Sequence, residues 1–307
     1  MTSFLHQALR AVPRAVYALV LCATIAPAGR AAPMEFPPVA EPASTEHHVG
    51  KVVWVDLVTP DLAAAKRFYA GLFGWTFRDN PATDKTYALA LLDGRPVGGL
   101  FQRVPPSGER RQPAWLTFIA VSDVDAVKRT AVGHGAKVLF EPKTLPLRGR
   151  QAVFSDPEGA VFAVVASSSG DPPDLLASPG EWIWSSLLVR DPGVDAAFYQ
   201  TLLGYDVFDL ASEDGAEHLI LSSDEYARAS VNALPAAGAH GHPHWLNFVR
   251  VVNATDLAAK VVALGGSVLV APHLDRHGGH VAVVADPAGA PFGLMEWMDS
   301  DSKAEPK

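Results

Sequence analysis

The sequence has little cysteine and no cluster of basic residues. Cys22 is the single cysteine among 307 residues, and it lies near the N-terminus. If that segment is removed, the remaining chain can form no disulfide bond and has no cysteine nucleophile. The formal net charge is −8 at pH 7. Because phosphate binding needs clustered Lys and Arg, we expect no nucleic-acid partner.

Several familiar catalytic patterns are also missing. The sequence contains no Gly-x-Ser-x-Gly nucleophile elbow, no P-loop and no His-Glu-x-x-His pair. These absences argue against common serine hydrolases, nucleotide triphosphatases and zinc proteases.

No apolar run is long enough to span a membrane, but residues 1–32 have the pattern of a secretory signal peptide. Arg10 and Arg14 precede an apolar stretch over residues 15–26, and small residues with proline follow. We expect an exported protein, periplasmic or extracellular, with no membrane contact beyond this segment. A lipoprotein anchored at Cys22 is the alternative, although Leu21 stands where a small residue is normally needed.

The chain repeats itself at a fixed spacing of 130 residues. Such self-similarity indicates a duplicated structural unit, and a unit of this size is a small domain rather than a solenoid repeat. The matched pairs include Trp54 and Trp184, Asp61 and Asp191, Tyr69 and Tyr199, Gly74 and Gly204, Trp115 and Trp245, Asp156 and Asp286, and Phe162 and Phe292.

We expect six segments in the chain: a signal peptide (1–32), a flexible linker (33–50), a first domain (51–168), a second linker (169–180), a second domain (181–298) and a disordered tail (299–307). The linker predictions rest on proline-rich and polar composition. Each domain reads as strand, capped helix and further strands, followed by the same order again. The sequence therefore predicts an α+β fold with two βαβββ modules per domain.

The motifs of both units resemble those of the vicinal oxygen chelate superfamily, which includes glyoxalases, bleomycin resistance proteins and extradiol dioxygenases. The resemblance is carried by Asp61-Leu62-Ala63-Ala64 with Phe68-Tyr69, by Phe73-Gly74-Trp75, by Asp123-Val124-Asp125-Ala126 and by Asp156-Pro157-Glu158-Gly159. It implies that paired modules form a cup-shaped mixed sheet around a bound divalent metal.

The metal ligands that the resemblance implies are not present at the matching positions. The position on the first strand is Trp54 or Trp184, where the family usually has histidine. The position on the strand that opens the second module is near Leu116 or Leu246, and the position on the last strand is Ala163 or Gly293. None of these side chains ligates a metal, so we expect no metal cofactor there.

Large aromatic residues are expected on the strands of the cup instead. They are Trp54, Trp115, Trp184 and Trp245. One interpretation is a pocket that stacks a small organic ligand, with Tyr69 or Tyr87 as a polar group. The other is that these tryptophans fill the core where the metal once was.

The two copies differ most in histidine. The second copy has a histidine cluster at His240, His242, His244, His277 and His280. Such a cluster could hold a divalent metal in a relocated site, although glycine and proline around it favour polar loops. Arg150 matches His280, and a basic group there could pair with an acidic group of a ligand.

Three hypotheses follow. The first is a metal-independent protein that binds a small organic molecule in one or both cups. The second is a lyase or dioxygenase-like enzyme with a relocated histidine site in the second domain. The third is a structural or interaction module with filled cups. The sequence determines neither the ligand nor the oligomeric state.

Overall fold

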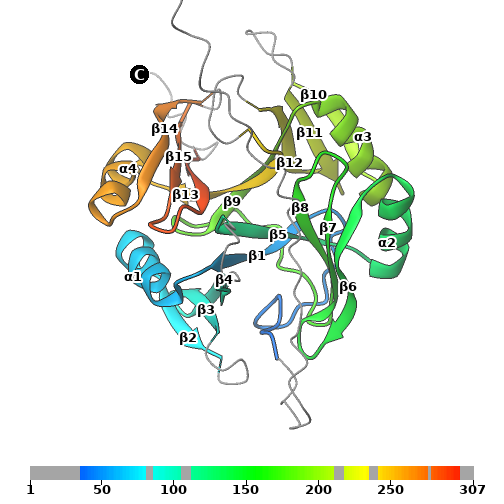
Figure 1. The fold of residues 1–307 in the computed structure, drawn as a ribbon, viewed down its shortest axis with the longest axis horizontal. Coiled ribbons are helices and arrows are strands. Elements are labelled where there is room, and N and C mark those ends of the chain that lie inside the picture. Colours follow the sequence, from blue (N-terminus) through cyan, green and yellow to red (C-terminus); the bar gives the residue numbers. More distant parts are fainter. Residues whose placement is uncertain are drawn as a thin grey trace, which may run out of the picture.

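The chain forms two domains of the same fold, packed against each other (Figure 1). The structure is a computed structural model, and it describes residues 35–80, 86–104, 112–210, 218–234, 241–275 and 278–297. The predicted signal peptide (1–32) and tail (299–307) lie outside the described residues. No helix in the described part of the chain is long and apolar enough to cross a membrane.

The first domain consists of two βαβββ modules. Its elements are β1 (Val52–Thr59), α1 (Leu62–Phe73), β2 (Thr76–Asp79), β3 (Tyr87–Leu92), β4 (Arg95–Gln102), β5 (Ala114–Ala120), α2 (Val124–Gly133), β6 (Lys137–Leu145), β7 (Gly149–Ser155) and β8 (Val161–Ser167).

The second domain repeats this order. Its elements are β9 (Trp182–Val189), α3 (Pro192–Leu203), β10 (Asp206–Asp209), β11 (His218–Ser223), β12 (Tyr226–Ala233), β13 (His244–Val251), α4 (Ala254–Ala263), β14 (Ser267–Leu274), β15 (His280–Ala285) and β16 (Pro291–Glu296).

Each domain has one mixed sheet of eight strands, which confirms the predicted α+β fold with two modules per domain. The strand order is β2-β3-β4-β1-β5-β8-β7-β6 in the first sheet and β10-β11-β12-β9-β13-β16-β15-β14 in the second. The first strands of the two modules, β1 and β5, pair antiparallel at the centre of the sheet. The modules thus extend to either side of these strands and curve into a cup.

Local capping explains where the first helix of each domain begins and ends. Asp61 accepts a hydrogen bond from the backbone N–H of Ala64 at 2.9 Å, and Asp191 does the same from Val194 at 3.1 Å. Both helices end at a glycine in the left-handed region, Gly74 and Gly204, where a residue without Cβ is favoured. The sequence signals for these helices were therefore sufficient.

The domains share their hydrophobic cores across the interface between them. Helix α1 packs beside α4 of the other domain, and α2 packs beside α3 (Figure 1). One core joins buried residues of α1 with those of α4, β15 and β16. At the centre, β5 and β13 are neighbours, and Asn247 Nδ2 donates to Thr117 Oγ1 at 3.0 Å. Burial of apolar surface therefore stabilises the pair of domains together.

The segment before the first domain is packed against it. The expectation of a flexible linker does not describe residues 35–50, because Phe36, Val39 and Ala40 are buried. Ser169 anchors the segment: its Oγ accepts from Ala40 N at 3.0 Å and its carbonyl from Ser44 N at 2.8 Å. The composition of the segment predicted a linker. It did not indicate that these three apolar residues would be buried in the tertiary structure.

The connection between the domains is also anchored by charge. Asp174 pairs with Lys51 at 2.8 Å and with Arg228 at 2.6 Å, and the Arg228 side chain is almost completely buried. Neighbouring cations lower the pKa of Asp174 in spite of partial burial, which raises it. The second linker thus contacts both domains through one carboxylate.

Candidate functional site

The concave face of the first sheet forms a cup, here called cup 1. Alternation along β1 points Trp54, Asp56 and Val58 toward the inside, while Val55 and Leu57 face the helices. On the neighbouring strand β5, Leu116 and Phe118 point the same way. A carboxylate and aromatic rings therefore meet on one surface.

A chain of buried hydrogen bonds lies at the base of cup 1. Asp56 Oδ1 accepts from Trp54 Nε1 at 2.8 Å and from Tyr87 Oη at 2.8 Å. Tyr87 Oη in turn accepts from Arg148 Nη2 at 3.1 Å. Burial, reinforced by the negative charge of Asp56, raises the pKa of Tyr87 well above its usual value. The tyrosine hydroxyl therefore stays protonated and donates its hydrogen bond to Asp56.

Arg148 is fully buried in this cup. Its guanidinium carbon lies 4.4 Å from the ring centroid of Trp54, 5.8 Å from that of Phe118 and 5.9 Å from that of Phe36. Stacking on aromatic faces stabilises a cation without supplying a hydrogen-bond acceptor. Among the described residues, none accepts a hydrogen bond from its Nε or Nη1.

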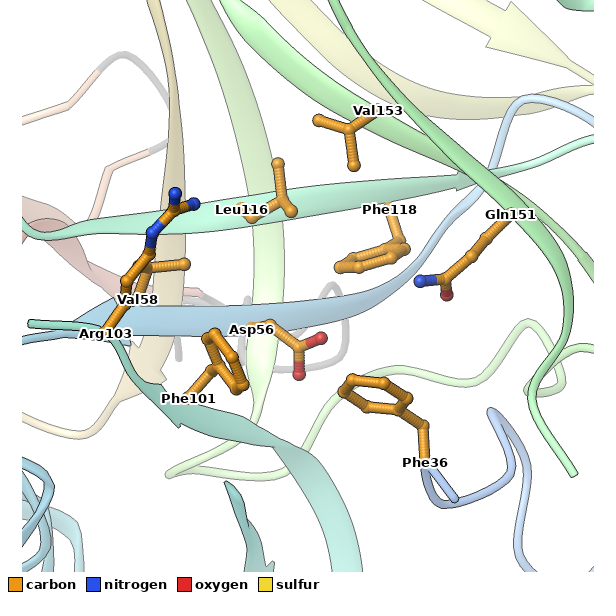
Figure 2. A pocket seen from close by; sticks show the side chains of 9 residues that line it. All are labelled: Phe36, Asp56, Val58, Phe101, Arg103, Leu116, Phe118, Gln151 and Val153. Atoms are coloured by element: carbon orange, nitrogen blue, oxygen red, sulfur yellow. The ribbon is translucent and has the colours of Figure 1, made fainter. Parts of the chain in front are cut away.

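A small cavity lies within cup 1 (Figure 2). The carboxylate of Asp56 and the amide of Gln151 point into it, and Phe36 lies across it from Phe118. The cavity has a volume of about 30 Å³, which is enough for about two water molecules. The lining residues are Phe36, Asp56, Val58, Phe101, Arg103, Leu116, Phe118, Gln151 and Val153.

Phe36, from the packed N-terminal segment, forms one wall of the cavity. Its ring meets the ring of Tyr87 edge to face, with the centroids 5.1 Å apart. Only 8% of Phe36 is exposed. Since the segment belongs to no strand or helix, the cup owes part of its closure to a chain segment outside the sheet.

Glycine at position 99 makes room for the hydrogen bonds of Asp56. In the β1–β4 pairing Gly99 lies opposite Asp56. A Cβ at this position would collide with Tyr87 Oη and Asp56 Oδ1. The absence of a side chain is thus a condition for the buried Asp56–Tyr87 contact.

The second sheet forms an equivalent cup, cup 2, with different polar chemistry. Ser186 lies opposite Ser230 as Asp56 lies opposite Gly99, and their hydroxyls are 2.7 Å apart. Trp184 Nε1 donates to Ser230 Oγ at 3.1 Å. His218 Nδ1 lies 2.6 Å from Asn232 Oδ1. A serine hydroxyl thus stands in cup 2 where cup 1 has the carboxylate of Asp56.

Cup 2 is also more exposed along one side. Strand β14 is almost entirely exposed, with Val268 at 37% and Val270 at 42%. The corresponding strand of cup 1, β6, contributes Leu139 and Phe140 to a hydrophobic cluster that includes Val39 of the N-terminal segment. The N-terminal segment therefore distinguishes the two cups.

The structure divides the four predicted tryptophans into two groups. Trp54 and Trp184 lie in the cups, as their strand positions predicted. Trp115 and Trp245 point to the opposite face of each sheet, into the cores shared by the domains. Their Nε1 atoms donate to Tyr69 Oη and Tyr199 Oη, both at 3.0 Å. The expectation that all four line the cups is therefore wrong for the second pair, because they have the opposite strand alternation.

Arg150 and His280 also lie outside the cups. Arg150 forms a bidentate pair with Asp125 of α2, at 2.7 and 2.8 Å. His280 Nδ1 lies 3.1 Å from Glu296 Oε2. Each of these two residues comes directly before a strand residue whose side chain faces the cup. Because side chains alternate along a strand, Arg150 and His280 point to the helical face. The basic residues inside cup 1 are instead Arg148, which is fully buried, and Arg103, which lines the cavity.

Sequence reasoning missed Asp56, Gln151 and Arg148. Asp56 carried a usable signal, because it is an acid two residues after Trp54 on the same face of an apolar strand. Gln151 likewise alternates with Val153. Arg148 gave no such signal, since it precedes β7 in a turn where Leu147 and Gly149 have positive φ angles of 65° and 101°.

The described histidines of the second domain do not converge. His244 begins β13, whereas His280 aligns through β15 and β16 with the far end of that strand at Val251. Seven residues of strand separate these levels by about 23 Å. His242 is two residues from His244, and His273 lies near His280 in the β14–β15 pair. His240 and His277 are outside the described residues. His244 and His280 therefore cannot share one metal ion.

The donor set within the cups does not fit the family's metal. The side chains at the implied ligand positions of cup 1 are Trp54, Leu116 and Ala163, and none offers a metal donor. The acid of cup 1, Asp56, already accepts two hydrogen bonds at one oxygen. Over the ranges that the structure describes, no group of three His, Cys, Asp or Glu residues is placed to hold a metal.

Comparison with known proteins assigns both domains to one superfamily. Residues 51–164 match the family model of the Glyoxalase/Bleomycin resistance protein/Dioxygenase superfamily. Residues 185–295 match the model of a Glyoxalase-like domain. The two matches coincide with the two cups.

Related sequences span nearly the same length. The putative glyoxylase CFP32 of Mycobacterium tuberculosis is 32% identical over 257 residues, which cover 83% of this chain and 98% of that protein. The anthracycline biosynthesis protein DauV of Streptomyces sp. strain C5 is 31% identical, over 82% of this chain and 94% of that protein. The two-domain arrangement is thus shared with these relatives.

Solved structures show the same fold at low sequence identity. A Mn(II)-bound glyoxalase from Novosphingobium aromaticivorans has a TM-score of 0.56 and 20% identity, covering 82% of this chain and 83% of that chain. The 2,3-dioxygenase LapB from Pseudomonas sp. KL28 has a TM-score of 0.58 and 13% identity, with coverages of 86% and 98%. Duplicated motifs, paired modules and these relatives together identify the chain as a tandem-domain member of the glyoxalase/bleomycin resistance protein/dioxygenase superfamily, the vicinal oxygen chelate proteins.

Proposed function

We propose that this protein binds a small organic molecule in cup 1 without the metal ion that is usual in its superfamily. The observation that carries the proposal is Trp54, which occupies the position of a metal ligand and stacks on a buried arginine. Its indole N–H is held by Asp56. A rigid aromatic surface beside fixed polar groups is the usual composition of a ligand pocket.

Cup 2 supports a second, different binding surface. Its network of Ser186, His218, Ser230 and Asn232 has no carboxylate and no guanidinium, and Trp184 supplies the aromatic surface. Such groups pair with hydroxyl or amide groups of a ligand rather than with a charge. The relationship to a protein named for anthracycline biosynthesis is compatible with an organic ligand.

Export is a further part of the proposal. It is supported by the basic, apolar and small-residue order of residues 1–32. N-terminal sequencing of the protein from a periplasmic or culture fraction tests it. A chain that keeps residues 1–32 and stays in the cytosolic fraction would contradict export.

Binding is tested by a ligand screen on protein purified without a His tag. We expect aromatic and other planar organic molecules to raise the unfolding temperature equally with and without EDTA, because no ligand contact runs through a metal. Trp54→Ala and Trp184→Ala should each remove the ligands of their own cup. Val132→Ala, at an exposed position of α2, serves as the control.

Two results would reject this function. Stoichiometric metal found by elemental analysis, with binding lost in EDTA, would favour the metal-dependent hypothesis. Ligands bound equally well by wild type, Trp54→Ala and Trp184→Ala would mean that the cups are filled cores. The small size of the cavity in cup 1 makes the second comparison the more informative one.

A further inference from the structure

Arg148 in cup 1 is a buried cation with unused hydrogen-bond donors. The residue is fully shielded from solvent, and Nη2 is its one nitrogen with a protein acceptor, Tyr87 Oη. No described residue accepts a hydrogen bond from Nε or Nη1. Burial of a guanidinium is costly unless it is paired and hydrogen-bonded. Arg148 therefore has the state expected of a residue whose partner arrives with a ligand.

Asp56 does not neutralise Arg148 directly. The Oδ1 atom of Asp56 accepts from Trp54 and from Tyr87, and the tyrosine hydroxyl stands between the carboxylate and the guanidinium. The chain of contacts fixes the orientation of the arginine through Nη2. It leaves Nε and Nη1, which lie on different edges of the planar guanidinium, without an acceptor among the described residues, so each is a separate donor for a charge-assisted hydrogen bond.

The cavity lies one aromatic ring away from the guanidinium of Arg148. Phe36 and Phe118 both line the cavity, and both rings lie within 5.9 Å of the guanidinium carbon. Phe118 is fixed on the central strand β5. Phe36 belongs to the N-terminal segment, outside the sheet (Figure 2). Displacement of the Phe36 ring is thus the less costly way to connect the cavity with Arg148.

Among the described residues of the second domain, the positions that match Arg148 and Asp56 carry no charge. At the repeat spacing, Gly278 stands in place of Arg148 and Ser186 in place of Asp56. Both cups nevertheless keep the same strand order. Arg148 and Asp56 are therefore not needed to build the scaffold, which favours a role in what cup 1 binds.

We propose that cup 1 recognises an organic acid, whose carboxylate accepts a charge-assisted hydrogen bond from an unpartnered nitrogen of Arg148, Nη1 or Nε, while its apolar body occupies the cavity between Phe118 and the displaced Phe36. This inference rests on the proposed binding function and narrows its ligand class. A carboxylate fits better than a phosphate, because Asp56 nearby repels a second negative charge. Gln151, whose amide points into the cavity, is placed to bind a further polar group of the acid.

The experiment compares acids with amides of the same shape. Benzoate, phenylacetate and 3-phenylpropionate are titrated into the wild-type chain by calorimetry, each beside its carboxamide. We expect the preferred acid to bind about tenfold tighter than its amide or more, since charge-assisted pairing is lost in the amide. The indole N–H resonance of Trp54, assigned with Trp54→Phe, should shift on binding.

Two arginine variants test which residue causes the preference for the acid over its amide. Arg148→Met should bind acid and amide with equal affinity. Arg150→Met should keep the wild-type preference, because Arg150 lies on the same stretch of chain but pairs with Asp125 outside the cup. If Arg148→Met fails to fold, Arg148→Lys keeps the charge but not the planar guanidinium with its fixed donor directions, and it should retain only part of the preference.

The outcomes separate this inference from the proposed function. An acid preference that persists in Arg148→Met, or acids and amides that bind wild type equally but are lost in Trp54→Ala, would overturn the arginine inference and leave binding in cup 1 intact. If none of the three pairs binds wild type at millimolar concentration while the ligand screen finds other molecules that Trp54→Ala no longer binds, the acid inference alone is overturned. If the screen also finds no ligand of cup 1, both proposals are overturned.

Discussion

Tyr199 of the second domain donates a hydrogen bond to Asp156 of the first, with Oη and Oδ2 3.1 Å apart. The duplicated pair repeats the contact in the other direction, from Tyr69 to Asp286 at 3.3 Å. Each aspartate belongs to the Asp-Pro-x-Gly turn of its own domain and each tyrosine to the first helix of the other. The repeated motifs therefore join the domains as well as forming them.

Removing one of these hydroxyls should weaken the domain interface. Tyr199→Phe deprives Asp156 of a donor and Trp245 Nε1 of its acceptor, both in a buried site. We expect a loss of about 1–3 kcal/mol in the free energy of unfolding, measured by urea denaturation. Tyr226→Phe, at an exposed position, is the control and should stay within error of wild type. Equal stability of both variants would contradict the interface role.

The same interface should make stability depend on pH. Burial, with the nearby charges of Asp156 and Glu158, raises the pKa of Asp195 to about 8. Burial also raises the pKa of Asp156 to about 6. An unfolded aspartate has a pKa of about 3.9, so the folded chain holds extra protons between these values. The contribution of these protons to the free energy of unfolding is complete below about pH 4. It is lost as the pH rises through about 6, for Asp156, and then about 8, for Asp195.

Asp195→Asn should therefore flatten the decline of stability between about pH 6 and pH 8. The wild type should lose up to about 1.4 kcal/mol per pH unit for this proton over the range in which Asp195 titrates. Urea denaturation at pH 6, 7 and 8 measures the slope. Asp209→Asn, on the exposed strand β10, should keep the wild-type slope. An unchanged slope in Asp195→Asn would show that another group takes up the proton.

Gly99→Ala tests the geometry beneath cup 1. The added Cβ collides with Tyr87 Oη and Asp56 Oδ1, so one of the buried contacts must break. Overpacking of this kind should cost about 1–3 kcal/mol in thermal or urea unfolding. Gly133→Ala, near the end of α2, meets nothing within 4 Å and should be neutral or slightly stabilising. Comparable losses in the two variants would rule out a specific clash.

Phe36→Ala tests whether the N-terminal segment is held by its aromatic contact. Truncation of a buried phenylalanine costs about 3 kcal/mol or more, so local opening of residues 35–44 should become at least about tenfold more frequent. Hydrogen exchange monitored by mass spectrometry measures this opening. Leu175→Ala, at a position that is 79% exposed, is the control. Slow exchange across 35–44 in both variants would show that Ser169 alone holds the segment.

Most of the fold was readable from sequence because its signals are local and occur twice. Caps such as Asp61 and terminators such as Gly74 act within one helical turn. At the Asp93-Gly94 hairpin, positive φ angles of 51° and 80° match the residue types. In the cup, the match to the ligand position of the first strand placed Trp54 correctly. Trp115 was suggested only because it lies on a strand of the cup, and it is buried on the other face.

The sequence by itself determined the duplicated scaffold and the replacement of the metal-ligand positions by Trp54 and Trp184. Only the tertiary structure decided that Arg148, rather than Arg150, enters the cup and that Phe36 closes it. Helices and turns are specified by neighbours in the chain, so their signals survive in any window of sequence. Arg148 meets Tyr87 at a sequence separation of 61 positions. Such a contact depends on how the sheet curves, and no local pattern encodes it.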